Sequence, residues 1–317
     1  MRYLHVAILS VTLLAYATPS LSQLVSEHVE WEGWKFDWEV RENTGVAIRN
    51  VFYKDELVLA KASVPVIRVQ YNKQRTWYKP STWFASRRDG YCGPFQDRIK
   101  WNDLKQNTEC QNRMVCVEPY ILDGVKWLEV GGYARIGEYH LYQAWYFSGD
   151  GEIRPALQSR GLSCRTTHRH HPYWRLDFAF DREAKKDEQV FVHTEGAQDE
   201  GWGPGWHKYT SEVNAEKGQQ RTWFVRNQTN GHGVWVIPGS HDGLPDDFAK
   251  IDVAVRQYNI LEDKPWEFGA CGQLGYFNND SVQEQDIVFW YVAHLRHEAG
   301  LGAAAWLTIG PTLKVQR

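Results

Sequence analysis

Short runs in which apolar residues alternate with polar ones, or are continuously apolar, recur along most of the chain. Such runs are typical of β-strands, and no long stretch shows the 3.6-residue period of an amphipathic helix. Gly149-Asp150-Gly151 and Asn230-Gly231 predict tight turns between neighbouring runs. The sequence therefore predicts an all-β protein. The predicted strands are residues 45–53, 56–71, 114–122, 125–130, 173–181, 189–193, 221–226, 233–237, 287–294 and 303–309.

The N-terminal residues predict export. Arg2, the apolar residues 6–16 and the small residues before Gln23 read as a secretory signal peptide over residues 1–22. The apolar run is too short to span a bilayer, and no second such run indicates a membrane anchor. In an exported chain, Asn227 and Asn279 head glycosylation sequons. A formal net charge of -3 argues against a nucleic-acid partner. No linker or repeat divides residues 23–317, so we expect one domain.

Two histidines at the head of a predicted strand suggest a metal site. His168 and His170 are two residues apart, so in a strand their imidazoles point to the same face. A third ligand could be His294 or His297, which follow the apolar run 287–292. Three neutral imidazoles suit Cu(II) or Zn(II) and suit Ca or Mg poorly. A His-x-His pair is also common at plain surface or core positions, so this spacing alone does not establish a site.

Residues 137–153 carry a second motif, in which Tyr139 is followed by Trp145-x-Phe147-x-x-Asp150-Gly151-x-Ile153. This segment resembles the cofactor strand of the copper amine oxidases, Gly-Asn-Tyr-Asp/Glu-Tyr followed by Trp-x-Phe-x-x-Asp-Gly-x-Ile. The resemblance implies that Tyr139 occupies the position of the tyrosine that copper and O₂ convert to topaquinone in that family. Tyr139 could equally be a packed core residue.

Three further segments extend this resemblance from about Gly45 to the C-terminus. His168 and His170, followed by Arg175-Leu176-Asp177, are similar to the family's copper strand. Residues 286–297 resemble its third-ligand strand, in a register that selects His297 over His294. Val69-Gln70-Tyr71 is similar to Val-Pro-Tyr, whose tyrosine hydrogen-bonds the quinone. The resemblance implies a large antiparallel β-sandwich of the catalytic-domain type without the smaller N-terminal domains. It also implies copper at His168, His170 and His297, and allows a homodimer.

Several family positions are changed. Glu138 and His140 replace the consensus neighbours of the precursor tyrosine, which leaves open whether Tyr139 is converted. The catalytic-base aspartate falls on or near Ala85, and Asp89 is the nearest carboxylate. That base removes the Cα proton of the substrate imine, and such a base is worth about 10²- to 10⁴-fold in rate. We therefore expect slow turnover of simple primary amines.

The resemblance also bears on a second metal and on the cysteines. Asp177 and Asp286 resemble part of the family's peripheral calcium site, but its other strand aspartate is Ala179 here, so we expect that site to be weak or empty. Five cysteines in an exported chain predict disulfides and one leftover thiol. The resemblance implies a Cys92–Cys116 pair. The pairing of Cys110, Cys164 and Cys271 stays open.

Three classes of function follow. The first is a copper oxidase that uses a quinone from Tyr139 on primary amines. The second, which the changed neighbours and missing base favour, is a copper-dependent oxidase with O₂ as oxidant and a non-standard amine or a phenolic small molecule as substrate. The third is a secreted copper or glycan binder without catalysis. Sixteen tryptophans could line a sugar-binding surface, although in a large sandwich they more often fill the core.

Overall fold

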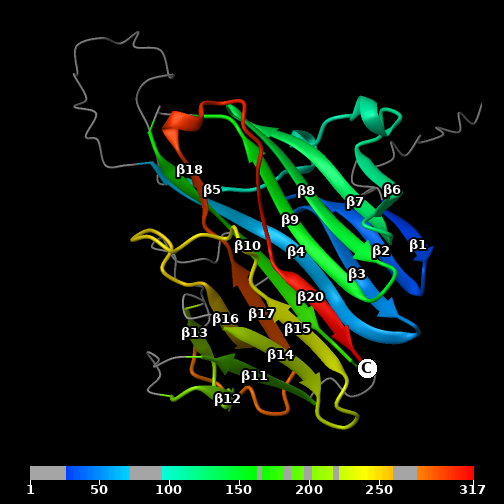
Figure 1. Ribbon diagram of the computed structural model, residues 1–317, viewed down its shortest axis with the longest axis vertical. Helices are drawn as coiled ribbons and strands as arrows, with labels where there is room; N and C mark the ends of the chain where they lie inside the picture. The colour runs from blue at the N-terminus through cyan, green and yellow to red at the C-terminus, as the bar shows by residue number, and fades with distance from the viewer. Residues whose placement is uncertain are drawn as a thin grey trace, which may run out of the picture.

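Two large antiparallel sheets packed face to face form the protein (Figure 1). The computed structural model describes residues 26–71, 95–162, 166–180, 187–195, 202–216, 221–259 and 277–317. The predicted all-β sandwich is therefore confirmed, while the predicted signal peptide, residues 1–22, lies outside the described residues. None of the described helices is long and apolar enough to cross a membrane.

The first sheet has the strand order β1-β2-β3-β4-β10-β17-β16-β13, with β5 paired to β4 and β18 paired to β10. Its strands are β1 (Ser26–Trp31), β2 (Trp34–Arg41), β3 (Gly45–Tyr53), β4 (Glu56–Tyr71), β5 (Phe95–Asp97), β10 (His168–Phe178), β13 (Val213–Ala215), β16 (Val253–Gln257), β17 (Ile287–Val292) and β18 (Leu295–His297).

The second sheet has the order β12-β11-β14-β15-β20-β9-β8-β7-β6, with β19 paired to β9. Its strands are β6 (Val115–Leu122), β7 (Val125–Ile136), β8 (Tyr139–Ser148), β9 (Glu152–Arg160), β11 (Glu188–Thr194), β12 (Gly205–Lys208), β14 (Thr222–Asn227), β15 (Gly233–Ile237), β19 (Leu307–Ile309) and β20 (Thr312–Gln316). Short 3₁₀ turns are η1 (Trp101–Asp103), η2 (Thr108–Cys110) and η5 (Ala299–Leu301).

Buried tryptophans and one glutamine join the two sheets. The indole nitrogens of Trp34 and Trp145 donate to the carbonyl oxygens of Ser148 and Val46, at 2.7 and 2.9 Å. The Gln143 side chain accepts from the amide nitrogen of Val46 and donates to its carbonyl oxygen, both at 3.0 Å. These bonds satisfy polar groups inside an apolar core, where an unpaired one would cost about 1–3 kcal/mol. Seven of the described tryptophans are buried in the core.

A glycine allows this close approach between the sheets. Gly45 has a φ of +62°, and a Cβ added there would lie 2.1 Å from the Gln143 side-chain oxygen. A larger residue at this position would be strained in its backbone and would push Gln143 away from Val46.

Strand β10 is central in the first sheet, between β4 on one side and β17 and β18 on the other. Nearly all of its residues are buried, because the second sheet covers one face and loops cover the other. The histidine pair of the sequence motif therefore lies inside the protein. β10 begins at His168, five residues before the predicted strand 173–181, so the histidine pair lies within the strand.

Candidate metal centre

The pairing of three strands brings the predicted site residues to one end of the sandwich. His168 lies directly opposite Tyr71 of β4 and directly opposite His297 of β18. Figure 1 shows β18 beside β10 at the end of the sheet where η5 also lies. Residues directly opposite each other on neighbouring strands share a face of the sheet, and His170 shares that face because it is two residues along.

Tyr139, the first residue of β8, reaches these histidines from the second sheet. Its hydroxyl oxygen is 2.9 Å from Nε2 of His168 and 3.0 Å from the hydroxyl oxygen of Tyr71. Its ring centre lies 4.6 Å from the ring centre of His170. All four side chains are buried. The structure thus places both tyrosines of the sequence motifs against the histidine pair.

The hydrogen bonds of His168 fix which of its nitrogens carries the proton. Nδ1 lies 2.7 Å from the carbonyl oxygen of Thr166. A carbonyl can only accept, so Nδ1 is protonated and Nε2 of the neutral ring presents a lone pair. Tyr71 donates to Tyr139, and Tyr139 in turn donates to Nε2 of His168. The backbone at Thr166 thereby orients the ring, as outer partners do for metal-binding histidines.

His297 is held in the same way but through the opposite nitrogen. Its Nε2 lies 3.2 Å from the carbonyl oxygen of Gly302, so this nitrogen carries the proton. Its Nδ1 is therefore a lone pair, and this buried atom has no hydrogen-bond donor among the described residues. A buried acceptor with no partner is costly, and a metal ion is one group that would satisfy it.

The histidine pair has the spacing that one ion requires. The Nε2 atoms of His168 and His170 are 3.0 Å apart. Two nitrogens each bound at about 2.0–2.1 Å to one ion stand about 2.9–3.4 Å apart, depending on the geometry. As the described side chains are placed, no group of three or more His, Cys, Asp or Glu is arranged to hold a metal ion. The pair and the free Nδ1 of His297 therefore fit a metal in donor chemistry, but they form an incomplete coordination shell.

Burial keeps the pair in the form that binds metals. Loss of solvent lowers the pKa of His168 to about 4, against a smaller opposing effect of the Thr166 carbonyl. The pKa of His170 is also lowered well below its usual value, first by burial and then by the neighbouring imidazoles. Both rings are neutral at physiological pH, and a neutral imidazole is the ligand for Cu(II) or Zn(II).

The remaining histidines of the motifs serve other contacts. His171 points to the opposite face of β10, where its Nδ1 lies 2.7 Å from Nδ1 of His294. The other ring nitrogens of this pair face carboxylates: Asp252 is 2.8 Å from His294, and Asp246 is 3.2 Å from His171. His294 therefore lies on the opposite face of β10 from His168. This agrees with the selection of His297 as the third ligand. On the outer face of the second sheet, His140 contacts the hydroxyl of Tyr133.

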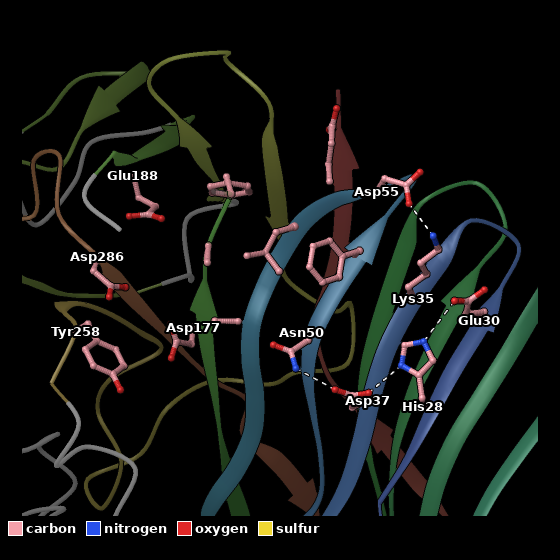
Figure 2. Close-up of a pocket in the computed structure, with 16 residues that line it drawn as sticks. His28, Glu30, Lys35, Asp37, Asn50, Asp55, Asp177, Glu188, Tyr258 and Asp286 are labelled. Atoms are coloured by element: carbon pink, nitrogen blue, oxygen red, sulfur yellow. Dashed lines mark hydrogen bonds and ion pairs between the residues drawn. The ribbon is translucent and has the colours of Figure 1, made fainter. Parts of the chain in front are cut away.

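The two aspartates of the expected calcium site line one cavity of about 1120 Å³ on the outer side of the first sheet. Figure 2 shows Asp177 and Asp286 there with a third carboxylate, Glu188, which the sequence motifs did not indicate. Asp177 accepts a bond of 3.1 Å from Arg175. Burial raises the pKa of Glu188 to about 9, and the nearby aspartates add to the effect. A protonated carboxyl is a poor ligand for a hard cation, and a weak or empty calcium site stays a prediction.

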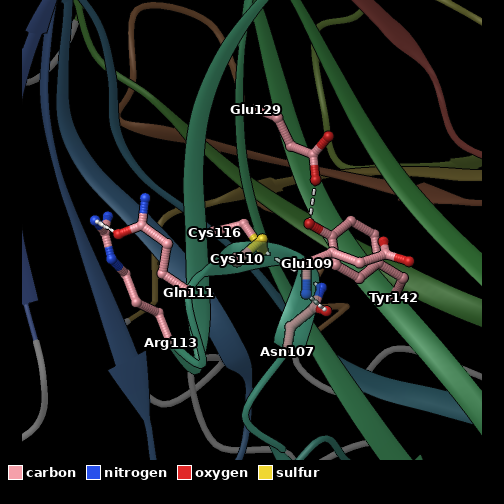
Figure 3. Close-up of a disulfide and its surroundings, with 8 residues drawn as sticks. All are labelled: Asn107, Glu109, Cys110, Gln111, Arg113, Cys116, Glu129 and Tyr142. Atoms are coloured by element: carbon pink, nitrogen blue, oxygen red, sulfur yellow. Dashed lines mark hydrogen bonds between the residues drawn. A yellow bond between two sulfur atoms is a disulfide. The ribbon is translucent and has the colours of Figure 1, made fainter.

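The predicted Cys92–Cys116 disulfide is corrected by the structure. Cys116 is bonded to Cys110, with their Cα atoms 5.5 Å apart (Figure 3). The turn at η2 and the first residues of β6 bring the two cysteines together, six positions apart in sequence. Spacing in sequence could not choose between partners for Cys116. Cys92, Cys164 and Cys271 lie outside the described residues.

The two asparagines of the predicted glycosylation sequons differ in exposure, and glycosylation of both stays a prediction. Asn227 is 2% exposed, its amide nitrogen donates to Asp187, and its amide oxygen accepts from the backbone of Thr229 and Asn230. This amide is not accessible in the folded chain. Asn279 is exposed, and its glycosylation stays a prediction. The base candidates, Ala85 and Asp89, lie outside the described residues.

Sequence reasoning missed three contributors to the site. The carbonyls of Thr166 and Gly302 belong to the backbone, so no residue type marks their role. Asp97 of β5 has a pKa raised to about 6 by burial. It contributes, after burial and Tyr139, to the raised pKa of Tyr71. It reaches that position only because β5 pairs with β4, and a three-residue strand leaves no periodic signal.

Comparisons with known proteins find this two-sheet sandwich in copper amine oxidases. The family described as "Copper amine oxidase, enzyme domain" matches residues 23–123. No curated protein sequence matches the chain.

Solved amine oxidase structures share the fold. A copper-containing benzylamine oxidase from Hansenula polymorpha superposes with a TM-score of 0.63 at 14% identity, over 91% of this chain and 59% of that one. An Aspergillus nidulans amine oxidase gives 0.64 at 13%, over 91% and 51%. A Pichia pastoris lysyl oxidase gives 0.61 at 14%, over 92% and 52%. The chain spans between half and three fifths of these relatives. It shares the fold of the copper amine oxidase enzyme domain.

Proposed function

We propose that this protein is a secreted, mononuclear copper-dependent oxidoreductase that uses O₂ as oxidant on a small molecule. The relation to amine oxidases rests on the family match and the shared fold. The changed neighbours of Tyr139 and the alanine near the expected base favour a divergent substrate, either a non-standard amine or a phenol. The observation that carries the metal is the unpartnered Nδ1 of His297, on the strand that pairs with His168.

Each residue of the site has a definite task in this proposal. Nε2 of His168, Nε2 of His170 and Nδ1 of His297 would hold copper, which supplies one-electron redox chemistry toward O₂. The carbonyls of Thr166 and Gly302 hold the His168 and His297 rings in the tautomers that put the lone pair on Nε2 of His168 and on Nδ1 of His297.

A hydrogen-bond chain from Tyr71 through Tyr139 to His168 orients the Tyr139 hydroxyl. The Tyr71 hydroxyl donates a hydrogen bond to the Tyr139 oxygen, so the Tyr139 hydroxyl is turned toward His168. Burial excludes water from both side chains and keeps the Tyr71 hydroxyl protonated, since loss of solvent raises the pKa of Tyr71 far above its usual value. Tyr139 is therefore positioned as the redox-active residue, either unmodified or as the precursor of topaquinone.

A visible spectrum of the copper-loaded full chain, recorded before and after phenylhydrazine, tests the proposal. A quinone band that shifts on treatment assigns the protein to the topaquinone class. Weak Cu(II) absorption alone, with one bound copper per chain and peroxide release from a phenol or amine panel, supports the divergent oxidase. Absence of bound copper after loading would contradict both. Bound copper with no oxidation of any substrate would leave the non-catalytic copper binder.

A further inference from the structure

A second polar cavity lies on the outer face of the second sheet, away from the candidate metal centre. It measures about 720 Å³, within the range of small-molecule sites. We call it the outer groove. Its lining includes the carboxylates Glu109, Glu118 and Glu129 and the rings of Tyr142, Tyr146 and Trp306. Because side chains alternate along a strand, Tyr142 and Tyr146 point outward from β8 whereas Tyr139 points inward.

Strand register builds the two walls of this groove. Tyr133 and Tyr142 face each other across β7 and β8, and Glu129 faces Tyr146 across the same pair. The Tyr142 hydroxyl donates to the Glu129 carboxylate, as Figure 3 shows. Gln158 of β9 donates to the Tyr146 hydroxyl at 3.1 Å. Aromatic rings and hydrogen-bonded acceptors therefore converge on one space.

The charge of the groove is strongly one-sided. Three carboxylates, Glu109, Glu118 and Glu129, line it with one guanidinium, Arg160, which lies 4.8 Å over the ring of Trp306. Burial raises the pKa of Glu129, and repulsion from the other two carboxylates raises it further, against the opposing bond from Tyr142. A positive ligand would relieve this repulsion, whereas a neutral sugar would leave it in place.

We propose that the outer groove binds a small organic ammonium ion. Ring faces of tyrosine and tryptophan attract cations, more strongly where water is excluded, and the carboxylates supply the counter-charge. The contact between Arg160 and Trp306 shows that a ring at this rim already accepts a cation. The groove has no side chain in common with the metal centre, so the inference stands apart from the proposed function.

A ligand-observed NMR titration of the full chain at low salt tests the inference. The probes are choline and its uncharged isostere 3,3-dimethylbutan-1-ol. Choline should bind at least about fivefold more tightly, since the two differ in charge and hardly in shape. Glu129→Gln and Trp306→Ala should each weaken choline binding about fivefold. Trp306 is exposed, so its removal tests the groove even if loss of the Glu129 charge perturbs the fold.

Glu138→Gln is the matched control, because it removes the same charge from the exposed turn between β7 and β8, outside the groove. It should leave choline binding unchanged. Equal binding of the two probes, equal weakening by the control, or binding of cellobiose in place of choline would each overturn the inference. None of these results bears on copper content, so the metal centre is judged separately.

Discussion

His168 lies directly opposite His297 across the pairing of β10 and β18, although the two are far apart in sequence. Their rings stack with centres 5.4 Å apart. One ring turns Nε2 to the site and the other turns Nδ1, because different backbone carbonyls hold them. The register between β10 and β18 therefore decides which histidine can be the third ligand.

Replacing His297 by alanine should reduce copper affinity at least about a hundredfold, since even outer partners of metal ligands are worth about 10- to 100-fold. Copper content of the purified full chain, measured after dialysis against a weak chelator, gives the answer. His168→Ala and His170→Ala should behave alike, and His28→Ala, an exposed change, should retain copper. Full retention in the His297 variant would show that the third ligand was wrongly chosen.

Turnover of simple primary amines should be slow or undetectable. Alanine stands near the position of the expected base, and Asp89 is not clearly in its place. A peroxide-release assay with benzylamine and short alkylamines measures this directly. Rates on the order of 1 to 10³ s⁻¹, ordinary for enzymes, would refute the argument from the missing base.

Tyr71→Phe should loosen the candidate site without unfolding the protein. The change removes the bond of 3.0 Å to Tyr139 and keeps the ring that packs against His168. We expect a loss of about 1 kcal/mol in the free energy of unfolding, measured by urea denaturation. If Tyr139 is oxidised in the wild type, intact mass should show less conversion in the variant. Unchanged stability and mass would mean that Tyr71 neither supports nor orients Tyr139.

Glu188→Gln should remove a pH dependence of stability. The carboxyl has an ordinary pKa of 4.5 and a folded-state pKa of about 9, so the folded chain keeps a proton that the unfolded chain releases between these values. The contribution of Glu188 to stability should therefore be fully present below pH 4.5 and fall as pH rises toward 9, by at most about 1.4 kcal/mol per pH unit.

Urea denaturation at pH 5 and pH 8 measures this effect. The glutamine variant should lose less stability between the two values than the wild type. Glu195→Gln, at an exposed position just beyond the same strand, is the control and should match the wild type. If the glutamine variant lost more stability between pH 5 and pH 8 than the wild type, the pKa of Glu188 would not be raised in the folded chain.

Trypsin can distinguish the disulfide partners of Cys116. Arg113 lies between Cys110 and Cys116, so cleavage after it leaves two peptides joined only by the disulfide. Mass spectrometry without reduction should find the peptide ending at Arg113 linked to the one beginning at Met114, and reduction should separate them. A link from the Met114 peptide to the one containing Cys92 would restore the pair implied by the family resemblance.

Much of the fold could be predicted because the core depends on alternation. The runs 45–53, 56–71 and 233–237 coincide with β3, β4 and β15. β2 was not predicted, although Trp34, Phe36, Trp38 and Val40 alternate with polar residues as a half-buried strand should. β5 and β13 have three residues each, too few to show any period.

Some residues of the candidate site could likewise be predicted from the sequence and others could not. His168 and His170 are two residues apart, so the sequence predicted that they share one face of a strand. The family motifs indicated Tyr139 and Tyr71, and the structure brings these two within hydrogen-bond distance of each other. The environment of Asp97 and Glu188 depends on strands and loops that meet only in the folded chain. No local pattern encodes such contacts, so burial and charge at these residues could be known only from the structure.

The position of β18 has a consequence for biosynthesis. A chain emerging from the ribosome has made His168 and His170 long before His297, and until β18 docks it offers an ion only two imidazoles. Tight copper capture should therefore wait for the last strands of the first sheet. Under the proposed function, copper would enter molecules in which β18 has docked and pass over those in which it has not.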